Sequence, residues 1–325
     1  MTREAIEKYQ VVIYVAAIIS GFFWGTHFPE LSLIFESLLW PVLGLLLYTT
    51  FTQIRLSKIR HAFVQDRRFI YTALAGNFVL IPLIILIFIT FLPDHPPIQL
   101  GVALVLLVPC TDWFITFTQL GRGDTERAIA FSPLSLLFQI LLLPAYLFLF
   151  FGQELTLFLA TNKMILAFTG IIILPLIIAW LTERWVEKAP DSRRKTISRL
   201  GWMPVPLLAA VIFMIAASQA HALRDASFLL AYPAICYVIF LLSAALLARV
   251  LAEIISLPVR QGRTLAFSFG SRNSFVVLPL ALALPESFEI TVLAVVLQSL
   301  IELFGMALYV WLVPGMLFKS RKKMT

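Results

Sequence analysis

The chain has 325 residues, 60% of them hydrophobic and only 13% charged, and its mean hydropathy is +0.93. Soluble globular proteins have about 45 to 50% apolar and about 25% charged residues, so the composition excludes an ordinary soluble domain. The net charge of +7 is concentrated in a few connections of the chain, and we therefore interpret it as a sign of membrane topology rather than of nucleic-acid binding.

Ten apolar runs of about 20 residues, each long enough to cross a bilayer as a helix, follow one another along the chain. The first run leads directly into further apolar runs and has no small-residue cleavage site, so we interpret it as a retained helix rather than a signal peptide. The predicted membrane segments are residues 9–25, 31–51, 69–92, 98–120, 128–151, 164–181, 200–218, 228–251, 264–284 and 289–318.

Lys and Arg residues are concentrated in alternate connections between these segments. The two ends of the chain and the connections after predicted helices 2, 4, 6 and 8 hold 21 of the 25 basic residues, whereas the other five connections hold only Lys163 and Arg224. Under the positive-inside rule, this bias places both termini in the cytoplasm, as in a multi-pass protein of a plasma or inner membrane. Arg249 lies near a cytoplasmic helix end and can extend to water, but Arg272 cannot do so easily.

Ten spans divided into five and five give two halves that start on opposite sides of the membrane. We predict a first repeat over residues 1–152 and a second over residues 153–325. The predicted fold is an all-α polytopic membrane protein with two inverted five-helix repeats, in which helices 4 and 9 are discontinuous and cross. Landmarks recur at a nearly constant offset between the halves: Pro41 and Pro204, residues 109–112 and 270–274, Gln139 and Gln298.

Polar residues interrupt the fourth and ninth apolar segments. A break at bilayer depth is costly, because each freed backbone group needs another partner where water is absent. Paired breaks in the two halves of a chain are typical of a transporter binding site, with helix N-termini directed at the substrate. The residues predicted to bind substrate are Cys110, Thr111, Asp112, Ser271, Arg272, Asn273 and Ser274.

Asp112, Arg272 and Glu302 each lie near the middle of a predicted span, where a charged residue costs about 2.5 to 3.5 kcal/mol or more. Asp112 and Arg272 could form a structural ion pair, or they could bind the substrate, and both interpretations stay open. Glu302 then has no obvious basic partner in the sequence, and burial of an isolated carboxyl group favours its neutral form. We therefore predict Glu302, with Asp112 as a second candidate, to be the proton-coupling residue; the alternative for Glu302 is helix packing.

Cys110 differs from the other cysteine, Cys236, because it lies in the break itself. A buried cysteine usually acts as a small apolar residue, which is our interpretation of Cys236. A thiol beside a cation such as Arg272 could instead contact a thiophilic substrate. Further polar groups could support the site or only connect helices: Ser135, Gln139, Gln298 and Asn77.

The sequence contains no Walker-type glycine loop, no His-Glu-x-x-His and no Gly-x-Ser-x-Gly. We therefore expect neither an enzyme nor an ATP-driven pump, and no cofactor. The expected partners are the lipid bilayer, a small-molecule or metalloid substrate and a coupling proton, with a homo-oligomer as a further option. Sodium is a less favoured coupling ion, and no nucleic-acid partner is expected.

These motifs resemble the bile acid/sodium symporter superfamily, and within it the branch of arsenite-efflux permeases. Residues 110–124 keep that branch's spacing from a membrane cysteine to a Gly-Asp pair, and the same register continues to Phe138-Gln139. Ser271-x-Asn273 resembles the branch's Ser-Asn-Asn, and Glu302 resembles the glutamate of its last helix. The resemblance implies that Cys110 contacts a metalloid and that Glu302 lies on the transport path.

The chain departs from both branches at the second break. Arsenite permeases usually have Asn where this chain has Arg272, Glu where it has Phe275, and Arg where it has Pro109. Sodium symporters have Glu-x-Gly-x-Gln-Asn where this chain has Ser268 to Asn273, so the acidic sodium ligand is missing and a cation replaces the glutamine. We therefore expect proton-coupled efflux of arsenite or a related metalloid oxyacid. Symport of an organic anion, or a sensor without transport, are the alternatives.

Overall fold

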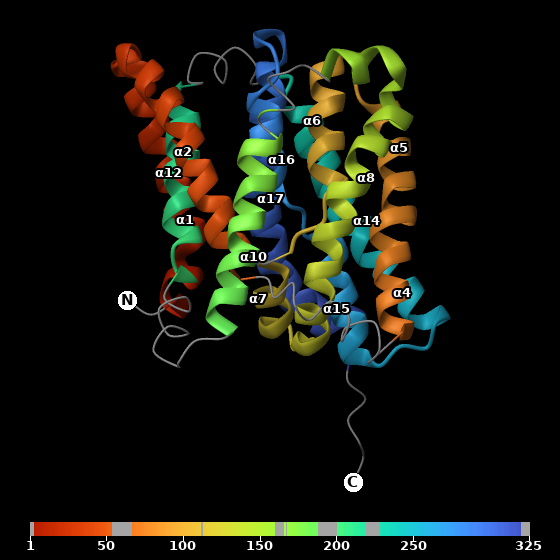
Figure 1. Ribbon diagram of the computed structural model, residues 1–325. Coiled ribbons are helices and arrows are strands. Elements are labelled where there is room, and N and C mark those ends of the chain that lie inside the picture. The colour runs from red at the N-terminus through yellow and green to blue at the C-terminus, as the bar shows by residue number, and fades with distance from the viewer. Residues whose placement is uncertain are drawn as a thin grey trace. The chain divides into compact units, whose positions relative to one another are not determined.

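The computed structural model describes residues 3–53, 67–111, 113–159, 166, 168–187, 200–218 and 228–319 (Figure 1). Within these ranges the chain is helical, and its only extended pairing is an isolated antiparallel bridge between Pro109 and Arg272. Six of the described helical segments are long and apolar enough to cross a membrane by length and composition, and shorter apolar helices accompany them. The chain is therefore a multi-pass membrane protein, as its composition predicted.

The chain divides into two compact units, and each unit takes segments from both predicted repeats. The first unit comprises Met1–Gln53, Leu157–Ala231 and Phe275–Val296. Its described helical elements are α1 (Arg3–His27), η1 (Pro29–Leu31), α2 (Ser32–Phe51), η4 (Phe168–Ile173), α10 (Leu174–Glu187), α12 (Pro204–Ser218), η5 (Glu286–Phe288), most of α16 (Ser274–Leu282) and the start of α17 (Glu289–Leu312).

Helix α12 packs against both α1 and α2, and α10 packs against α2. Gly21 lets α1 and α12 approach closely, because a Cβ atom at this position would lie 2.4 Å from the carbonyl oxygen of Phe213. Small residues allow such close contacts between helices in membranes. The rings of Phe213 and of Phe35 from α2 also pack in a T-shaped, edge-to-face arrangement, with centroids 5.4 Å apart.

The second unit comprises Ile54–Thr156, Tyr232–Ser274 and Leu297–Thr325, and it contains every residue of the predicted site that the structure describes. The rest of α17 and the start of α16 belong to it. Its other elements are α4 (Arg67–Ala75), the π-helical turn η3 (Gly76–Leu80), α5 (Ile81–Phe91), α6 (Pro96–Leu106), α7 (Trp113–Leu120), α8 (Thr125–Leu159), α14 (Ala231–Ile254), α15 (Val259–Gly270) and the π-helical turn η6 (Val313–Leu317).

Each of the ten predicted segments overlaps a described helix or pair of helices, with boundaries that differ by several residues. The fourth and ninth segments are each split in two, as the polar interruptions predicted. The third contains the π-helical turn η3, which the apolar pattern did not indicate. Helix α8 is interrupted at Gly152 (φ +76°), one residue after the predicted end of the fifth segment, and a further helical stretch follows to Leu159. The start of the sixth predicted segment lies outside the described residues. The inverted-repeat relation and its boundaries stay predictions.

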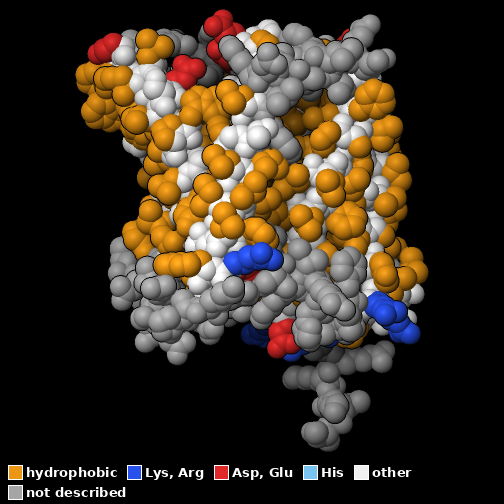
Figure 2. Space-filling view, viewed as in Figure 1, with side chains coloured by type: hydrophobic (Ala, Val, Ile, Leu, Met, Phe, Trp, Pro, Cys, Tyr) orange, Lys and Arg blue, Asp and Glu red, His pale blue; other side chains and the backbone are white. Residues whose placement is uncertain are grey.

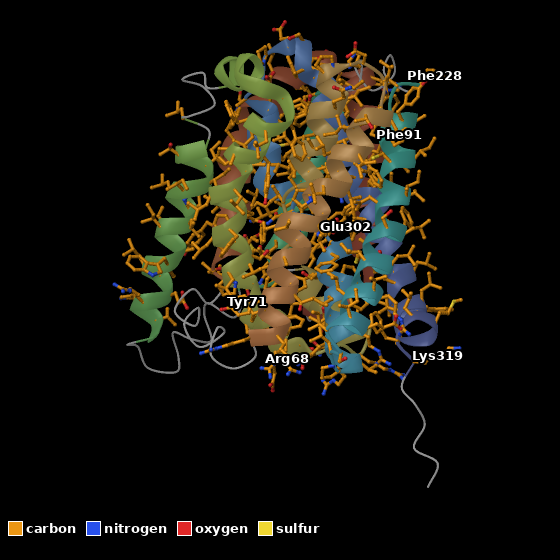
Figure 3. All side chains as sticks on the ribbon, turned by 90° about the vertical axis from the view of Figure 1, so that its right-hand side faces the viewer. Arg68, Tyr71, Phe91, Phe228, Glu302 and Lys319 are labelled. Carbon is orange, nitrogen blue, oxygen red and sulfur yellow. The ribbon has the colours of Figure 1, made fainter. Side chains whose placement is uncertain are left out.

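The surface suits a lipid environment. Hydrophobic side chains cover the length of the visible helices in Figure 2, and the visible charged side chains lie near helix ends. Many large apolar side chains are exposed, among them Phe91 and Trp311. Figure 3 shows Arg68 and Lys319 near one end of the second unit, Phe91 near the other end, and Glu302 between them. The cytoplasmic placement of the termini stays a prediction.

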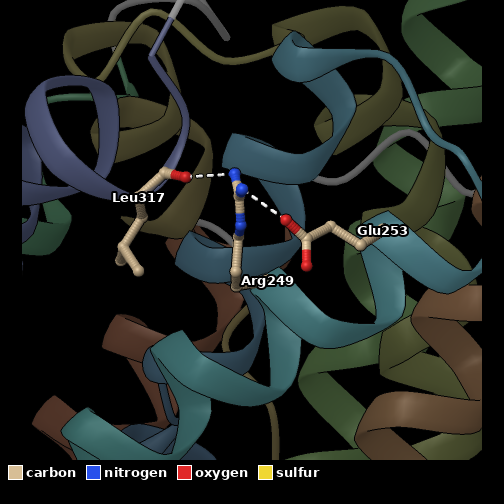
Figure 4. Close-up of polar contacts among 3 residues, drawn as sticks. All are labelled: Arg249, Glu253 and Leu317. Atoms are coloured by element: carbon tan, nitrogen blue, oxygen red, sulfur yellow. Dashed lines mark hydrogen bonds and ion pairs between the residues drawn. The ribbon is translucent and has the colours of Figure 1, made fainter.

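The side chain of Arg249 caps the C-terminal end of η6 in the second unit (Figure 4). Its guanidinium group donates a hydrogen bond to the carbonyl oxygen of Leu317, the last residue of η6, and forms an ion pair with Glu253 one turn along α14. Basic side chains stabilise helix C-termini because they bond the last carbonyl groups and oppose the negative end of the helix dipole. Arg249 thus acts at a helix end, where the sequence placed it.

Candidate functional site

The two interrupted helices meet at their breaks. The chain leaves helical geometry between α6 and α7 and again between α15 and α16. There the N–H of Cys110 donates to the carbonyl oxygen of Ser271 at 3.0 Å, and the N–H of Asn273 donates to that of Val108 at 2.7 Å. This short antiparallel pairing satisfies backbone groups that the breaks release, as a low-dielectric environment requires.

Pro109 and Arg272 are the central residues of this pairing. Both hydrogen bonds are made by their neighbours, so the pair itself is of the kind that exchanges no backbone hydrogen bond. A proline, which has no N–H, is therefore tolerated at position 109. The N–H of Arg272 remains available, and it donates to the carboxylate of Glu302 at 2.7 Å.

Glu302, on α17, is buried with 3% of its surface exposed, and three donors are directed at its carboxylate. The hydroxyl of Ser271 bonds Oε1 at 2.7 Å, whereas the N–H of Arg272 and the side-chain amide of Gln298 both bond Oε2, at 2.7 and 2.6 Å. The amide oxygen of Gln298 in turn accepts from the hydroxyl of Ser274 at 2.7 Å. The predicted proton carrier is thus bonded to the second break and to the predicted supporting residue Gln298.

The Arg272 side chain makes a separate set of contacts with neutral oxygens. Its Nη1 donates to the carbonyl of Leu106 at 3.1 Å. Its Nη2 lies 2.9 Å from Oδ1 of Asn77, 2.9 Å from the carbonyl of Ser268 and 2.6 Å from that of Phe269. Arg272 is 3% exposed, so the guanidinium group is enclosed by protein. Both Nη atoms are therefore bonded to protein oxygens, whereas Nε has no hydrogen-bond partner among the described residues.

Thr111 and Asn273 face one another across the breaks. The side-chain amide of Asn273 lies 3.4 Å from the hydroxyl of Thr111, and the hydroxyl of Ser132 on α8 donates to the Thr111 carbonyl. All three are buried. Asp112 lies outside the described residues, so its predicted pairing with Arg272 and its predicted proton-coupling role stay predictions.

Cys110 lies at the pairing between the breaks and is 3% exposed. Its backbone N–H donates to the carbonyl oxygen of Ser271, and the hydroxyl of the same Ser271 donates to Glu302. Cys110 is thus linked to Glu302 through a single residue of the second break. Cys236 is also a buried thiol but lies on α14. The different roles predicted for the two cysteines stay predictions.

Helix α8 presents three polar side chains at helical spacing. Ser132, Ser135 and Gln139 follow at i, i+3 and i+7 and therefore share one face. Ser132 bonds the first break, whereas neither the hydroxyl of Ser135 nor the amide of Gln139 has a hydrogen-bond partner among the described residues. Both are almost completely buried. Buried polar groups without partners are rare in folded proteins, and such groups are typical of positions that bind a ligand or water.

Several groups that bond residues of the two breaks were not among the predicted substrate-binding residues. Asn77 was named as a polar group that could support the site or only connect helices, and it contacts the guanidinium group from the turn η3. Turns of this π-helical kind are frequent at functional sites. The role of Ser132 could have been found from its spacing to Ser135 and Gln139. The role of the Leu106 carbonyl could not have been found from the sequence, because every residue type has the same backbone carbonyl group. Among the described residues, no three His, Cys, Asp or Glu side chains are close enough to hold a metal ion.

In this chain two interrupted helices meet at their polar breaks, and a buried carboxylate is bonded to one of the breaks. Such an arrangement is typical of membrane transporters in which the substrate and the coupling ion bind inside the bilayer. The model of one protein family, described as the Sodium Bile acid symporter family, matches residues 40–225, which is more than half of the chain. The chain belongs to this family, whose members are transporters and not enzymes. The match includes the first break and ends before the second. A search of curated proteins gave no match.

Proposed function

We propose that this chain is a secondary transporter that exports arsenite, or a related metalloid oxyacid, in exchange for a proton. The observation that carries the proposal is the position of Cys110: it is a buried residue at the pairing of the two breaks, and its backbone N–H is bonded to Ser271, whose hydroxyl donates to Glu302. Thiols prefer soft, thiophilic centres. The resemblance of residues 110–124 to the arsenite-efflux branch supports the same substrate.

The chemistry of such a substrate suits a single thiol. Arsenite at neutral pH is the uncharged acid As(OH)3, and the thiol of Cys110 can replace one of its hydroxyl groups. The S–H proton joins the departing hydroxyl as water, and an S–As bond forms. A lone thiol holds the metalloid reversibly, and the unpartnered groups of Ser135 and Gln139 are candidates to bond its remaining hydroxyl groups.

The coupling proton is assigned to Oε1 of Glu302. Oε2 already accepts two N–H bonds, one from the backbone of Arg272, which cannot reverse, and one from the side-chain amide of Gln298, whose oxygen accepts from Ser274. Oε1 faces only the hydroxyl of Ser271 among the described donors, and a hydroxyl can either donate or accept. Rotation of this hydroxyl would let the same hydrogen bond persist when the carboxyl group is protonated. Glu302 can therefore change charge while its three hydrogen bonds persist, with the direction of the Ser271 bond reversed.

The inverted-repeat architecture is part of the proposal. The first unit takes α1 and α2 from the first predicted repeat and α10 and α12 from the second, which are the corresponding helices of two five-helix repeats. The second unit takes the third, fourth and fifth helices of the first predicted repeat and their counterparts in the second, except that most of α16 and the start of α17 fall in the first unit. This division supports a repeat boundary near residue 152.

Symport of an organic anion is the second candidate, and the family match favours it. In that case Arg272 would bind the carboxylate or sulfonate group of the substrate. The contacts of its Nη atoms with four protein oxygens argue against this role for Arg272, because those bonds would have to break first.

Arsenic tolerance of a sensitive host separates the two candidates. Expression of the wild-type chain should restore growth on arsenite, Cys110→Ser should abolish this effect, and Cys236→Ser should keep it. Cys236 is a suitable control because it is also a buried thiol in the same unit. If wild-type expression gives no resistance, or if Cys110→Ser is as protective as the wild type at equal expression, the metalloid proposal is wrong.

A further inference from the structure

The Arg272 guanidinium group lies where the C-terminal ends of two half-helices meet. Leu106 is the last residue of α6, and Ser268 and Phe269 belong to the last turn of α15. Carbonyl groups in this position have no partner within their own helix. Here they accept hydrogen bonds from the guanidinium group instead, together with the side-chain oxygen of Asn77.

None of those four acceptors is an acidic side chain, although the carboxylate of Glu302, which accepts from the backbone N–H of Arg272, also attracts the guanidinium charge. Each helix C-terminus carries about half a negative charge, so the two ends together offset about one positive charge. The ring of Phe240 lies 5.3 Å from the guanidinium carbon and adds a cation–π contact. These contacts explain how a cation with 3% exposure is tolerated.

The oxygens are held in place independently of Arg272. The side-chain amide of Asn77 donates to the carbonyl of Ala73 at 3.1 Å and to the hydroxyl of Ser268 at 3.0 Å, which directs its oxygen at the guanidinium group. The carbonyls of Leu106, Ser268 and Phe269 are fixed by their helices. Removing the arginine side chain would therefore leave four oxygens around a space that had held a positive charge.

An arrangement of this kind is a cation site. Rings of carbonyl oxygens replace the hydration shell of small monovalent ions in channels. In secondary transporters, the C-terminal ends of broken helices coordinate sodium. The family name of this chain includes sodium, yet its own residues place an arginine at this position.

We propose that Arg272 is a built-in cation that occupies a monovalent-cation site, so that transport by this chain uses no sodium ion at that position. The inference rests on the chain being a transporter, but it does not depend on the identity of the substrate. It predicts that the wild-type protein is indifferent to sodium and that the site becomes available to sodium once the arginine side chain is removed.

The first test uses the purified wild-type protein in detergent. Its thermal unfolding should be the same in sodium, potassium and choline chloride at equal ionic strength. A stabilisation that is specific to sodium and saturates with its concentration would overturn the proposal. This measurement needs no substrate, so its outcome is separate from that of the arsenite experiment.

The second test compares Arg272→Ala with Arg263→Ala. Arg263 is a matched control, because it is also buried and its guanidinium group also bonds helix-end carbonyls, those of Phe318 and Arg122. Both variants should unfold at lower temperature in choline. Sodium should restore only Arg272→Ala, and at ten times its dissociation constant it should favour the folded state about elevenfold.

Arg272→Lys should keep the charge and remain indifferent to sodium. If Arg272→Ala does not fold, Arg272→Gln replaces it, since it shortens the side chain and removes its charge. Equal responses of the Arg272 and Arg263 variants to sodium, or no response in a folded Arg272→Ala or Arg272→Gln protein, would contradict the proposal.

Discussion

Replacing Glu302 by Gln separates the protonation of this group from its packing. The amide oxygen of Gln can take the position of Oε2 and accept the N–H groups of Arg272 and Gln298, while its NH2 group donates to the hydroxyl of Ser271. Hydrogen bonds to a charged group contribute about 1.5 to 3 kcal/mol and neutral ones about 0.5 to 1.5, so three weakened bonds lose about 3 kcal/mol. Removing a buried charge recovers a desolvation cost of several kcal/mol.

Glu302→Gln is therefore expected to be nearly as stable as the wild type. Glu302→Ala is the contrasting variant, because it leaves three buried donors without an acceptor at about 1 to 3 kcal/mol each, a loss of about 3 kcal/mol or more. Unfolding in denaturant measures both differences. In proteoliposomes, Glu302→Gln should bind substrate but should no longer respond to an imposed pH gradient. Transport by this variant that follows the pH gradient as the wild type does would refute the assignment of Glu302.

Three further predictions concern the packing around the site. Gly76→Ala should destabilise the protein by about 1 to 3 kcal/mol, because the new Cβ would lie 2.0 Å from the ring of Phe269. Gly44→Ala is the control: its new Cβ would have no atom within 4 Å, so this variant should not lower the melting temperature. Ser132→Ala should lose about 1 kcal/mol, measured by denaturant unfolding, through its bond to the Thr111 carbonyl; an unchanged stability would contradict the contact. Gln139→Leu should leave the melting temperature equal or higher, since it removes two unbonded buried atoms, but should weaken substrate binding in a titration of the purified protein; unchanged affinity would remove Gln139 from the site.

The positions of the breaks were predictable because a polar run in an apolar segment is visible in residue type alone. Pro109, Arg272 and Asn273 are conspicuous in such surroundings, and the structure pairs the two runs through their backbones. The hydrogen bonds from the second break to Glu302 were not predicted, because their donors include the backbone N–H of Arg272. A backbone group has the same chemistry in every residue, so only geometry reveals it.

The contacts of Arg272 also depend on backbone groups that the sequence does not reveal. Its charge and its depth were visible in the sequence, and they suggested either an ion pair or a substrate contact. Among the described residues, its guanidinium group contacts three carbonyl groups, one amide oxygen and the ring of Phe240, whereas Asp112 lies outside those residues. Helix C-termini carry partial charges that depend on where the helices end and meet, which a hydropathy pattern does not determine. The π-helical turn that positions Asn77 was missed for a similar reason, because its apolar flanks are indistinguishable from those of a regular helix.

The measurement that tests the central claim most directly is exchange of labelled arsenite in proteoliposomes that contain the purified chain. The account predicts that unlabelled arsenite inside the vesicles drives uptake of the label, that an imposed pH gradient alone also drives its movement, and that Cys110→Ser abolishes both while Cys236→Ser keeps both. Binding of arsenite without exchange, or exchange that is indifferent to Cys110, would contradict the account.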